Sequence, residues 1–318
     1  MNIDYLHNHN EFPQLLNIVA EEISIIPQLI EKDYWIMHVL NGLKQQGFEF
    51  ELKGGTSLSK GYKLINRFSE DIDIHIQPAI EQNVESNPNK CKPNHVQSRK
   101  EYYDWLSRKI EINGILSVER DTSFDDTHFY RSGGIRLFYK NVTGQFNGVK
   151  EGILLEVGFD KVTPNNSLNI SSWAFDRAVV TKRNEILDNR ALDIRCYHPG
   201  YTLVEKLQTI ATKFRQERET GLERPNLLRQ YYDVYCLLGN ADVRSFIGTN
   251  EYHSHKKMRF PKIDFEIPAY ENEAYILSDP RLRENFIKRY QKTAALYYSG
   301  QPSFEELLER IKEHIRHF

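Results

Sequence analysis

Residues 51–76 read ELKGGTSLSKGYKLINRFSEDIDIHI, and this stretch decides the fold. Two segments, FEFEL at 48–52, which runs into this stretch, and DIDIHI at 71–76, within it, alternate between apolar and polar or charged residues, which predicts two half-buried strands. The glycine pair at 54–55 predicts a turn after the first strand. The next ten residues, TSLSKGYKLI, place apolar side chains at helical spacing behind Thr56, a suitable N-cap, so a short helix is expected between the strands.

Two aspartates, Asp71 and Asp73, share one face of the second predicted strand. Residues two apart in a strand point to the same side, and the rise per residue separates their Cα atoms by roughly 6–7 Å. Ile72, Ile74 and Ile76 point the other way, toward a core. Adjacent carboxylates repel each other, so their shared face favours a divalent cation, and Mg²⁺ or Mn²⁺ prefers oxygen ligands of this kind.

The glycine turn predicts a phosphate site next to that cation. Backbone N–H groups at a helix N-terminus bind anions, and glycine lets the phosphate come close. Gly54, Gly55, Thr56 and Ser57 are therefore candidate nucleotide-binding residues, with Ser57 offering a hydroxyl donor. A triphosphate beside a divalent cation is the arrangement that phosphoryl or nucleotidyl transfer requires.

Each part of this pattern also has a simpler interpretation. A single Asp-x-Asp arises by chance in chains of this size, and most Gly-Gly pairs are only turns, but the ordered combination is more specific. A P-loop is rejected because Ser59 stands where its second glycine belongs and Gly61 where its metal-binding Ser or Thr belongs. A phosphatase of the Asp-x-Asp-x-Thr kind is also a poor match, since His75 replaces the threonine.

A third metal-binding carboxylate is expected on the predicted strand 152–160. Ile153, Leu155 and Val157 form its apolar face, and Glu156 lies on the opposite face. An acidic residue on an otherwise apolar strand is costly to bury without a cationic partner. Glu156 is thus a candidate metal ligand, and a solvent-facing carboxylate is the alternative.

The rest of the chain divides at a change of composition near Pro199 and Gly200. Residues 1–198 are expected to form a mixed α/β domain, and 199–318 a mainly helical one. The polar stretch 81–100 is expected to be a surface loop. Two S/T-x-x-E capping boxes are predicted, one at Thr202 and Glu205, the other at Ser303 and Glu306. The other expected elements are helices over 14–46 (broken at Pro27), 101–113, 202–217, 226–239, 281–298 and 303–316, strands over 134–140 and 152–160, and few helical signals over 250–280.

Composition restricts the class of protein. The chain has 318 residues and a net charge of −2, so it has no bulk attraction for nucleic acid and would bind RNA only through a local patch. Its mean hydropathy is −0.60, and no apolar run approaches the ~20 residues that span a bilayer, so no membrane association is expected. Three separated cysteines and the absence of a secretory signal lead us to expect a cytoplasmic protein.

Two charged residues of the C-terminal half are further candidates. Lys206 lies near the expected domain boundary, where it could reach a phosphate. Asp233 follows Arg229 by four residues on a predicted helix, and the simpler interpretation is a salt bridge between those two.

These segments together resemble a known family, the AbiEii/AbiGii type nucleotidyltransferase toxins of bacterial abortive-infection and toxin–antitoxin systems. The likeness runs from about residue 28 to 240, and its glycine and Asp-x-Asp element is similar to that of the wider DNA-polymerase-β-like superfamily. The matching stretches are EKDYWI (31–36), KGGTSLSK (53–60), RFSEDIDI (67–74), TLVEKLQTI (202–210) and RQYYDVYCLL (229–238).

The resemblance implies an α+β fold, a polymerase-β-like mixed sheet with helices followed by a mainly helical C-terminal domain. It also implies that Lys206 contacts the triphosphate and that Asp233 is a second essential acidic residue, a candidate base for the acceptor. Lys32 and Arg67 fall within matched segments, and Arg67 is a further nucleotide-binding candidate. Two departures are a Gly-Gly-Thr-Ser turn where the superfamily has Gly-Ser, and Glu156 where an aspartate is expected.

The expected function is a Mg²⁺-dependent nucleotidyltransferase toxin. It would transfer a nucleoside monophosphate from a nucleoside triphosphate to RNA, and the resemblance implies that the acceptor is a tRNA 3′ end, as it often is in the family, and that a cognate antitoxin exists. Two alternatives remain open: a non-catalytic module that binds a nucleotide or a partner, and a nucleotidyltransferase acting on a protein or a small molecule.

Overall fold

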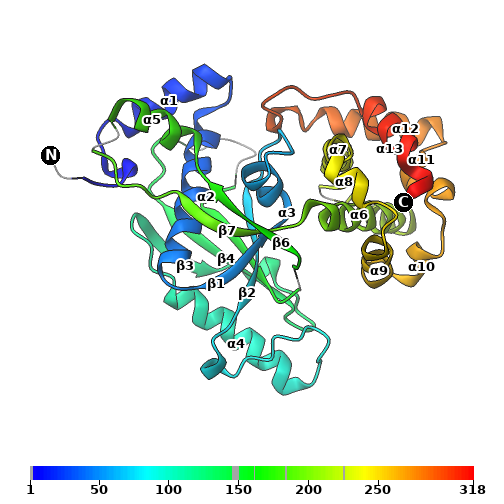
Figure 1. The fold of residues 1–318 in the computed structure, drawn as a ribbon, viewed down its shortest axis with the longest axis horizontal. Coiled ribbons are helices and arrows are strands. Elements are labelled where there is room, and N and C mark those ends of the chain that lie inside the picture. The colour runs from blue at the N-terminus through cyan, green and yellow to red at the C-terminus, as the bar shows by residue number, and fades with distance from the viewer. Residues whose placement is uncertain (1–2, 145–149, 161, 183–184, 225) are drawn as a thin grey trace. The chain divides into compact units, whose positions relative to one another are not determined.

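The chain forms two compact units in the computed structural model (Figure 1). The first comprises residues 1–61 and 68–197, and the second comprises 62–67 and 198–318. The sequence pattern gave no sign that the short segment 62–67 belongs with the C-terminal helices. The structure describes residues 3–144, 150–160, 162–182, 185–224 and 226–318.

A seven-stranded mixed sheet organises the first unit (Figure 1). Its strands lie in the order β3-β4-β5-β2-β1-β7-β6. The β2/β5 and β1/β7 pairs are parallel, and the other neighbours are antiparallel. The strands are β1 (Glu49–Lys53), β2 (Asp71–Gln77), β3 (Ile115–Arg120), β4 (Ser132–Tyr139), β5 (Ile153–Gly158), β6 (Asn165–Ile170) and β7 (Ala191–Tyr197). The expected α+β class with a mixed sheet is confirmed.

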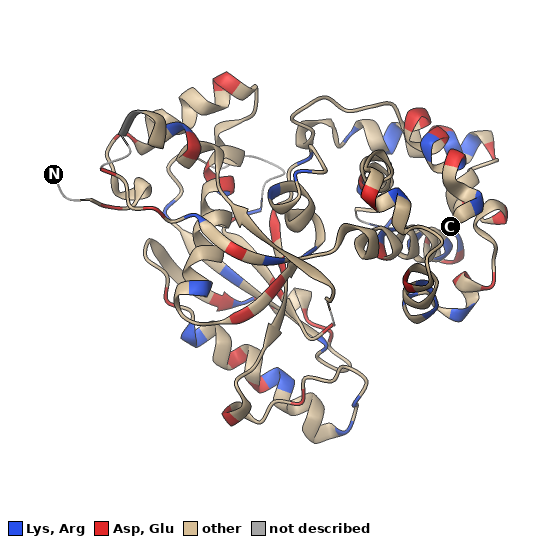
Figure 2. Cartoon of the chain, in the orientation of Figure 1, with Lys and Arg blue, Asp and Glu red and all other residues tan. Residues whose placement is uncertain are grey.

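The register of the central strands separates an apolar face from a charged one. Leu52 pairs with Ile74, and both are fully buried. On the other face, Asp73 lies opposite Lys53 on β1 and opposite Glu156 on β5. Charged positions accordingly follow these strands (Figure 2). The alternation in the sequence therefore predicted correctly that Phe50 and Leu52 enter the core, whereas Phe48 is only half-buried and Glu51 on the charged face is buried as well.

Helices of the first unit pack against this sheet and against one another. Helix α2 contacts β5 and β7, and α4 contacts β3 and β4. Pro27 begins α2, as a proline at the first helical position does, and the expected break between two N-terminal helices is confirmed. The helices are α1 (Phe12–Ile23), α2 (Pro27–Gln45), α3 (Gly54–Thr56), α4 (Pro93–Lys109) and α5 (Trp173–Lys182), with a π-helical turn η2 (Ser57–Gly61) directly after α3.

The loop expected over 81–100 is only partly correct, because α4 begins at Pro93. The first turns of this helix lack an apolar stripe and are held instead by Arg99, which is fully buried. Its guanidinium donates to the carbonyls of Lys90 and Phe129, at distances between 2.7 and 3.1 Å. A buried arginine that satisfies backbone carbonyls leaves no hydrophobic period in the sequence.

The second unit is helical, as expected (Figure 1). Helix α6 contacts α7, α8 and α9, and α13 contacts α7. The helices are α6 (Pro199–Thr220), α7 (Leu227–Gly239), α8 (Ala241–Phe246), α9 (Asn250–Arg259), α10 (Lys262–Phe265), α11 (Glu273–Ile276), α12 (Pro280–Gln291) and α13 (Phe304–His314). The sequence showed few helical signals over 250–280, and the expectation of little helix there was wrong, because α9, α10 and α11 lie in this range.

One predicted capping box is confirmed and the other is wrong. Ser303 Oγ accepts the N–H of Glu306, whose carboxylate accepts from the N–H of Ser303. Helix α6 instead begins at Pro199, with His198 Nδ1 accepting the N–H of Gly200, so Thr202 lies inside the helix. None of the helices in the described part of the chain has the length and apolar character needed to cross a membrane.

Candidate functional site

The glycine turn and the Asp-x-Asp strand lie against each other. Gly54 has φ +71°, and a Cβ atom built on it would lie 2.2 Å from Asp73 Oδ2. Thr56 does not cap the short helix as expected, because that helix begins at Gly54; its Oγ1 donates to the backbone carbonyl of Asp71 instead. The turn is therefore bonded to the backbone of β2 at Asp71, the first of the two aspartates.

The Asp71 carboxylate has one oxygen engaged and one left over. Its Oδ2 lies 3.3 Å from Lys150 Nζ. Its Oδ1 is buried and has no hydrogen-bond partner among the residues that the structure describes. Buried carboxylate oxygens are normally satisfied, so an orphaned one points to a missing ligand.

Glu156 lies beside this pair and carries a strongly perturbed carboxyl group. Its backbone is directly opposite Asp73 on the neighbouring parallel strand. Burial, followed by the negative charges of Asp73 and Asp71, raises the pKa of Glu156 to about 8. Within the described ranges, no three His, Cys, Asp or Glu side chains gather closely enough to hold a metal ion on their own.

A divalent cation nevertheless fits the Asp71 and Asp73 pair. The donors are hard carboxylate oxygens, one of them is orphaned, and the missing side chain at Gly54 lets the Asp73 carboxylate lie against the turn. Mg²⁺ is usually held by one or two carboxylates and keeps its other positions for water and phosphate oxygens. Two protein ligands are thus sufficient, and the role of Glu156 as a third stays a prediction.

The residues expected to bind phosphate differ in accessibility. Gly55, Thr56 and Ser57 are all buried. The Ser57 hydroxyl is buried and has no hydrogen-bond partner among the residues that the structure describes. Burial raises the pKa of the Cys196 thiol to about 12. The hydroxyl expected to reach phosphate is therefore buried, and the backbone at Gly54 is the more accessible part of the turn.

In the second unit, three of the predicted residues form one buried ion cluster. The Arg67 guanidinium binds both carboxylate oxygens of Asp233, at 2.6 and 2.7 Å. Lys206 Nζ lies 3.0 Å from Asp233 Oδ2. Although burial acts to raise the pKa of Asp233, the charges of Arg67 and Lys206 outweigh it, and the pKa is lowered. The sequence grouped Asp233 with Arg229 and gave no signal that Arg67, distant in the chain, is its partner.

Three consecutive charged residues near the start of α2, Glu31, Lys32 and Asp33, bind partners from other segments of the first unit. Glu31 accepts from the backbone N–H groups of Val142 and Thr143. Asp33 pairs with Lys60 Nζ at 2.5 Å, and Lys32 pairs with Glu70 at 3.3 Å. All three α2 side chains are buried, at 1 % exposure or less. The signal for them was available, because a run of three charges inside an otherwise apolar helix needs buried partners.

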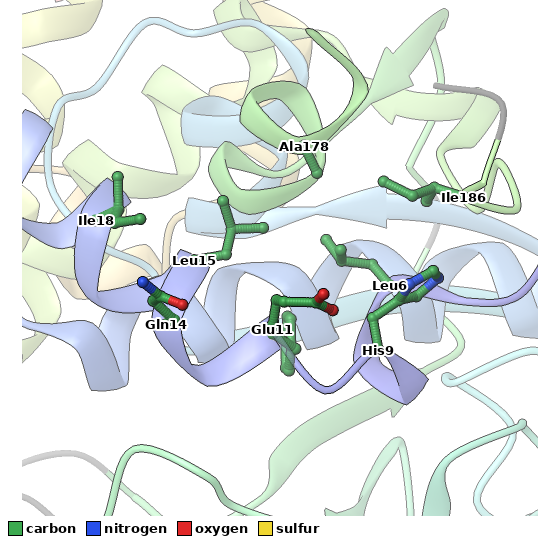
Figure 3. Close-up of a pocket in the computed structure, with 9 residues that line it drawn as sticks. Leu6, His9, Glu11, Gln14, Leu15, Ile18, Ala178 and Ile186 are labelled. Carbon is green, nitrogen blue, oxygen red and sulfur yellow. The ribbon is translucent and has the colours of Figure 1, made fainter. Parts of the chain in front are cut away.

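A separate apolar pocket of about 210 Å³ lies between α1 and α5 (Figure 3). None of the predicted site residues lines it. Its lining is Leu6, His9, Glu11, Phe12, Gln14, Leu15, Ile18, Ala178 and Ile186.

Comparison with solved structures gives only distant matches. The crystal structure of JHP933 from Helicobacter pylori is 16% identical, with a TM-score of 0.39, over 84% of this chain and 95% of the other. An antigenic nucleotidyltransferase-like protein from Paracoccidioides brasiliensis is 13% identical, with a TM-score of 0.35, over 72% of this chain and 94% of the other. At these scores neither match supports an argument about the chain. No curated protein matches it.

A family model gives a decisive match. The family described as "Nucleotidyl transferase AbiEii toxin, Type IV TA system" matches residues 39–310. The match begins after the EKDYWI segment and extends well beyond residue 240, where the sequence resemblance was expected to end. It includes the glycine turn, both aspartates of β2, Lys206 and Asp233. The chain therefore belongs to the AbiEii nucleotidyl transferase toxin family of type IV toxin–antitoxin systems.

Proposed function

We propose that this chain is a Mg²⁺-dependent nucleotidyltransferase that transfers a nucleoside monophosphate from a nucleoside triphosphate to RNA, with the 3′ end of tRNA as the acceptor. The observation that carries the proposal is the contact between the glycine corner and the Asp-x-Asp strand, in which Gly54 leaves room for the carboxylate of Asp73. The orphaned oxygen of Asp71 supports it independently.

In the proposed reaction, different residues of the first unit would bind the triphosphate and the metal ion. The backbone at Gly54 and Gly55 would bind the triphosphate, and Asp71 and Asp73 would hold Mg²⁺ or Mn²⁺. A cation held there would neutralise phosphate charge and lower the pKa of the attacking hydroxyl. In the overall reaction, the acceptor oxygen bonds to the α-phosphorus, the bond to the β-phosphate breaks, pyrophosphate leaves and the hydroxyl proton is released.

For Asp233 we propose a positioning role in place of the expected role as a base. Both of its oxygens already accept from Arg67, one of them also contacts Lys206, and its pKa is lowered. A carboxylate that is fully engaged and hard to protonate is a poor proton acceptor. Asp233 would instead fix the Lys206 ammonium, whose contact with the triphosphate stays a prediction.

Membership of the family supports two further proposals about context. A type IV toxin–antitoxin family implies that a cognate antitoxin exists for this chain. We also propose that the protein acts in the cytoplasm, where its triphosphate and RNA substrates are found.

The test is a transfer assay with four α-³²P-labelled nucleoside triphosphates, Mg²⁺ and total RNA. We expect one of the four to label RNA of tRNA size, and Asp71→Asn or Asp73→Asn to abolish labelling with an unchanged thermal unfolding curve. Asp193→Asn is the matched control, because Asp193 is an exposed strand aspartate, with 77 % of its side chain accessible. Full labelling by both β2 variants would reject the proposal.

Two other outcomes would favour the alternatives. Label that enters protein and leaves RNA unlabelled would indicate a nucleotidyltransferase acting on protein hydroxyls. Metal-dependent nucleotide binding without any product would indicate a non-catalytic binding module.

A further inference from the structure

Lys150 is held at the carboxylate pair by contacts to its backbone. Its N–H donates to Glu70 Oε2 at 3.0 Å, and its carbonyl accepts from Lys32 Nζ at 2.6 Å. Its own Nζ reaches Asp71 Oδ2 at 3.3 Å. Lys150 precedes β5, so its position near the site comes from these contacts and not from the sheet ladder.

The Lys32–Glu70 ion pair that makes these contacts is itself buried. Its side chains are 1 % and 5 % exposed, and its charged atoms are 3.3 Å apart. Desolvation cancels much of the attraction within such a pair, so a buried ion pair is weak support for stability alone. Here both side chains also form hydrogen bonds with the main chain of Lys150: Lys32 donates to its carbonyl, and Glu70 accepts from its N–H. The pair therefore serves to fix the position of one residue.

The Lys150 ammonium contacts the protein but remains partly exposed to solvent. Besides Asp71, it lies 5.1 Å from the centre of the Phe124 ring. Its side chain is 42 % exposed, and that of Asp71 is 26 % exposed. A lysine carries a compact charge on a flexible stem, so the ammonium can leave one anion for another nearby while its backbone stays fixed.

We propose that Lys150 is a nucleotide-binding residue that competes with the divalent cation for Asp71 and, once displaced, binds a phosphate oxygen of the nucleoside triphosphate. This inference rests on the proposed function for the identity of the ligand. In the metal-free protein, Lys150 neutralises Asp71 and keeps the two carboxylates of β2 together. When the cation takes its place, the ammonium lies beside the incoming triphosphate.

Removal of the charge should therefore have opposite effects on the two ligands. Without its competitor, Mn²⁺ should bind the nucleotide-free protein more tightly, by about threefold to tenfold. With Mg²⁺ saturating, the affinity for triphosphate should fall by about tenfold, because a hydrogen bond to a charged group is lost. A residue with a merely structural role would weaken both ligands together.

The experiment compares wild type with Lys150→Met and Lys150→Arg. Lys140→Met is the matched control, because Lys140 is an exposed lysine at the other end of the β4–β5 connection. Free Mn²⁺ is measured by electron paramagnetic resonance. Nucleotide affinity is measured by calorimetry with Mg²⁺ and the non-hydrolysable α,β-methylene analogues of ATP, GTP, CTP and UTP, one at a time.

Tighter Mn²⁺ and weaker analogue binding in Lys150→Met, with Lys140→Met unchanged and Lys150→Arg close to wild type for the analogue, is the expected result. Unchanged or jointly weakened binding of both ligands in Lys150→Met overturns the inference. If wild type binds no analogue, the proposed function fails, and the Mn²⁺ measurement alone still decides whether Lys150 competes with a cation at Asp71.

Discussion

Gly54 and Asp73 approach each other so closely that no side chain fits between them. A Cβ atom on Gly54 would lie 2.2 Å from Asp73 Oδ2 and 2.9 Å from its Cγ, and Gly54 also has a positive φ of 71°. Glycine is thus required twice at this position, once for the backbone and once for the carboxylate. The contact joins the two halves of the site, the turn and the acidic strand.

Substitution of Gly54 by alanine should inactivate the protein more than it destabilises it. The variant must move the Asp73 carboxylate, and a displacement of 1 Å at a reacting centre costs about 100-fold in rate. Gly47→Ala is the control, since Gly47 has φ +79° and a Cβ atom added there would meet no atom within 4 Å, so it isolates the backbone strain of about 1–2 kcal/mol. Transfer rates and urea unfolding of both variants test this, and equal activities would contradict it.

Removal of one member of the Arg67–Asp233 pair should strongly destabilise the second unit. Asp233 is fully buried, and its loss leaves the charges of Arg67 and Lys206 without their partner. Removal of one member of a buried ion pair typically costs about 3–5 kcal/mol. We expect Asp233→Asn to lower the free energy of unfolding by about this amount in denaturant titrations. A loss under about 1 kcal/mol would show that the cluster contributes little.

The same pair predicts a dependence on pH. The folded pKa of Asp233 is depressed below its ordinary value of 3.8, so its contribution is fully present above that value and is lost as the pH falls through the folded pKa. The stability difference between wild type and Asp233→Asn should be constant from about pH 5 to 8 and shrink in acid below about pH 4. A difference that shrinks as the pH rises through the neutral range would have the wrong sign.

The Lys32–Glu70 pair should behave as a coupled unit in a double-mutant cycle. Lys32→Met alone leaves the Glu70 charge buried and should lower the free energy of unfolding by about 3–5 kcal/mol. Glu70→Gln should lower it by a smaller amount. The double variant should recover much of the stability, because no unpaired charge remains. It should still lose nucleotide affinity, since Lys150 is no longer fixed. Additive losses would disprove the coupling.

The sequence predicted the strands β1 and β2 and the face that each residue occupies, because alternation with a period of two leaves little freedom. It also predicted that Asp71 and Asp73 lie together beside the glycine turn. It missed β3, β6 and β7, whose residues are too mixed in polarity to show a clear period. Burial of a strand depends on its neighbours, and those are set by the fold of distant segments.

The supporting contacts were hidden for a related reason. Arg67 meets Asp233 across 166 positions of the sequence, and Lys32 meets Lys150 across 118. From local spacing alone, Arg229 is the expected partner of Asp233, because residues four apart on a helix are neighbours. That rule gives no information about partners that are distant in the sequence. The residues that would carry the chemistry follow from local pattern, whereas the residues that hold them in place follow from the tertiary fold.

The central claim is that the Asp71 and Asp73 carboxylates and the glycine corner together bind a metal–nucleotide complex. The most direct measurement is anomalous X-ray diffraction from crystals grown with Mn²⁺ and a non-hydrolysable nucleoside triphosphate. We predict a manganese peak within about 2.5 Å of one oxygen from each aspartate, with the triphosphate against the backbone at 54–57. A nucleotide bound elsewhere, with no manganese between the two aspartates, would contradict the account.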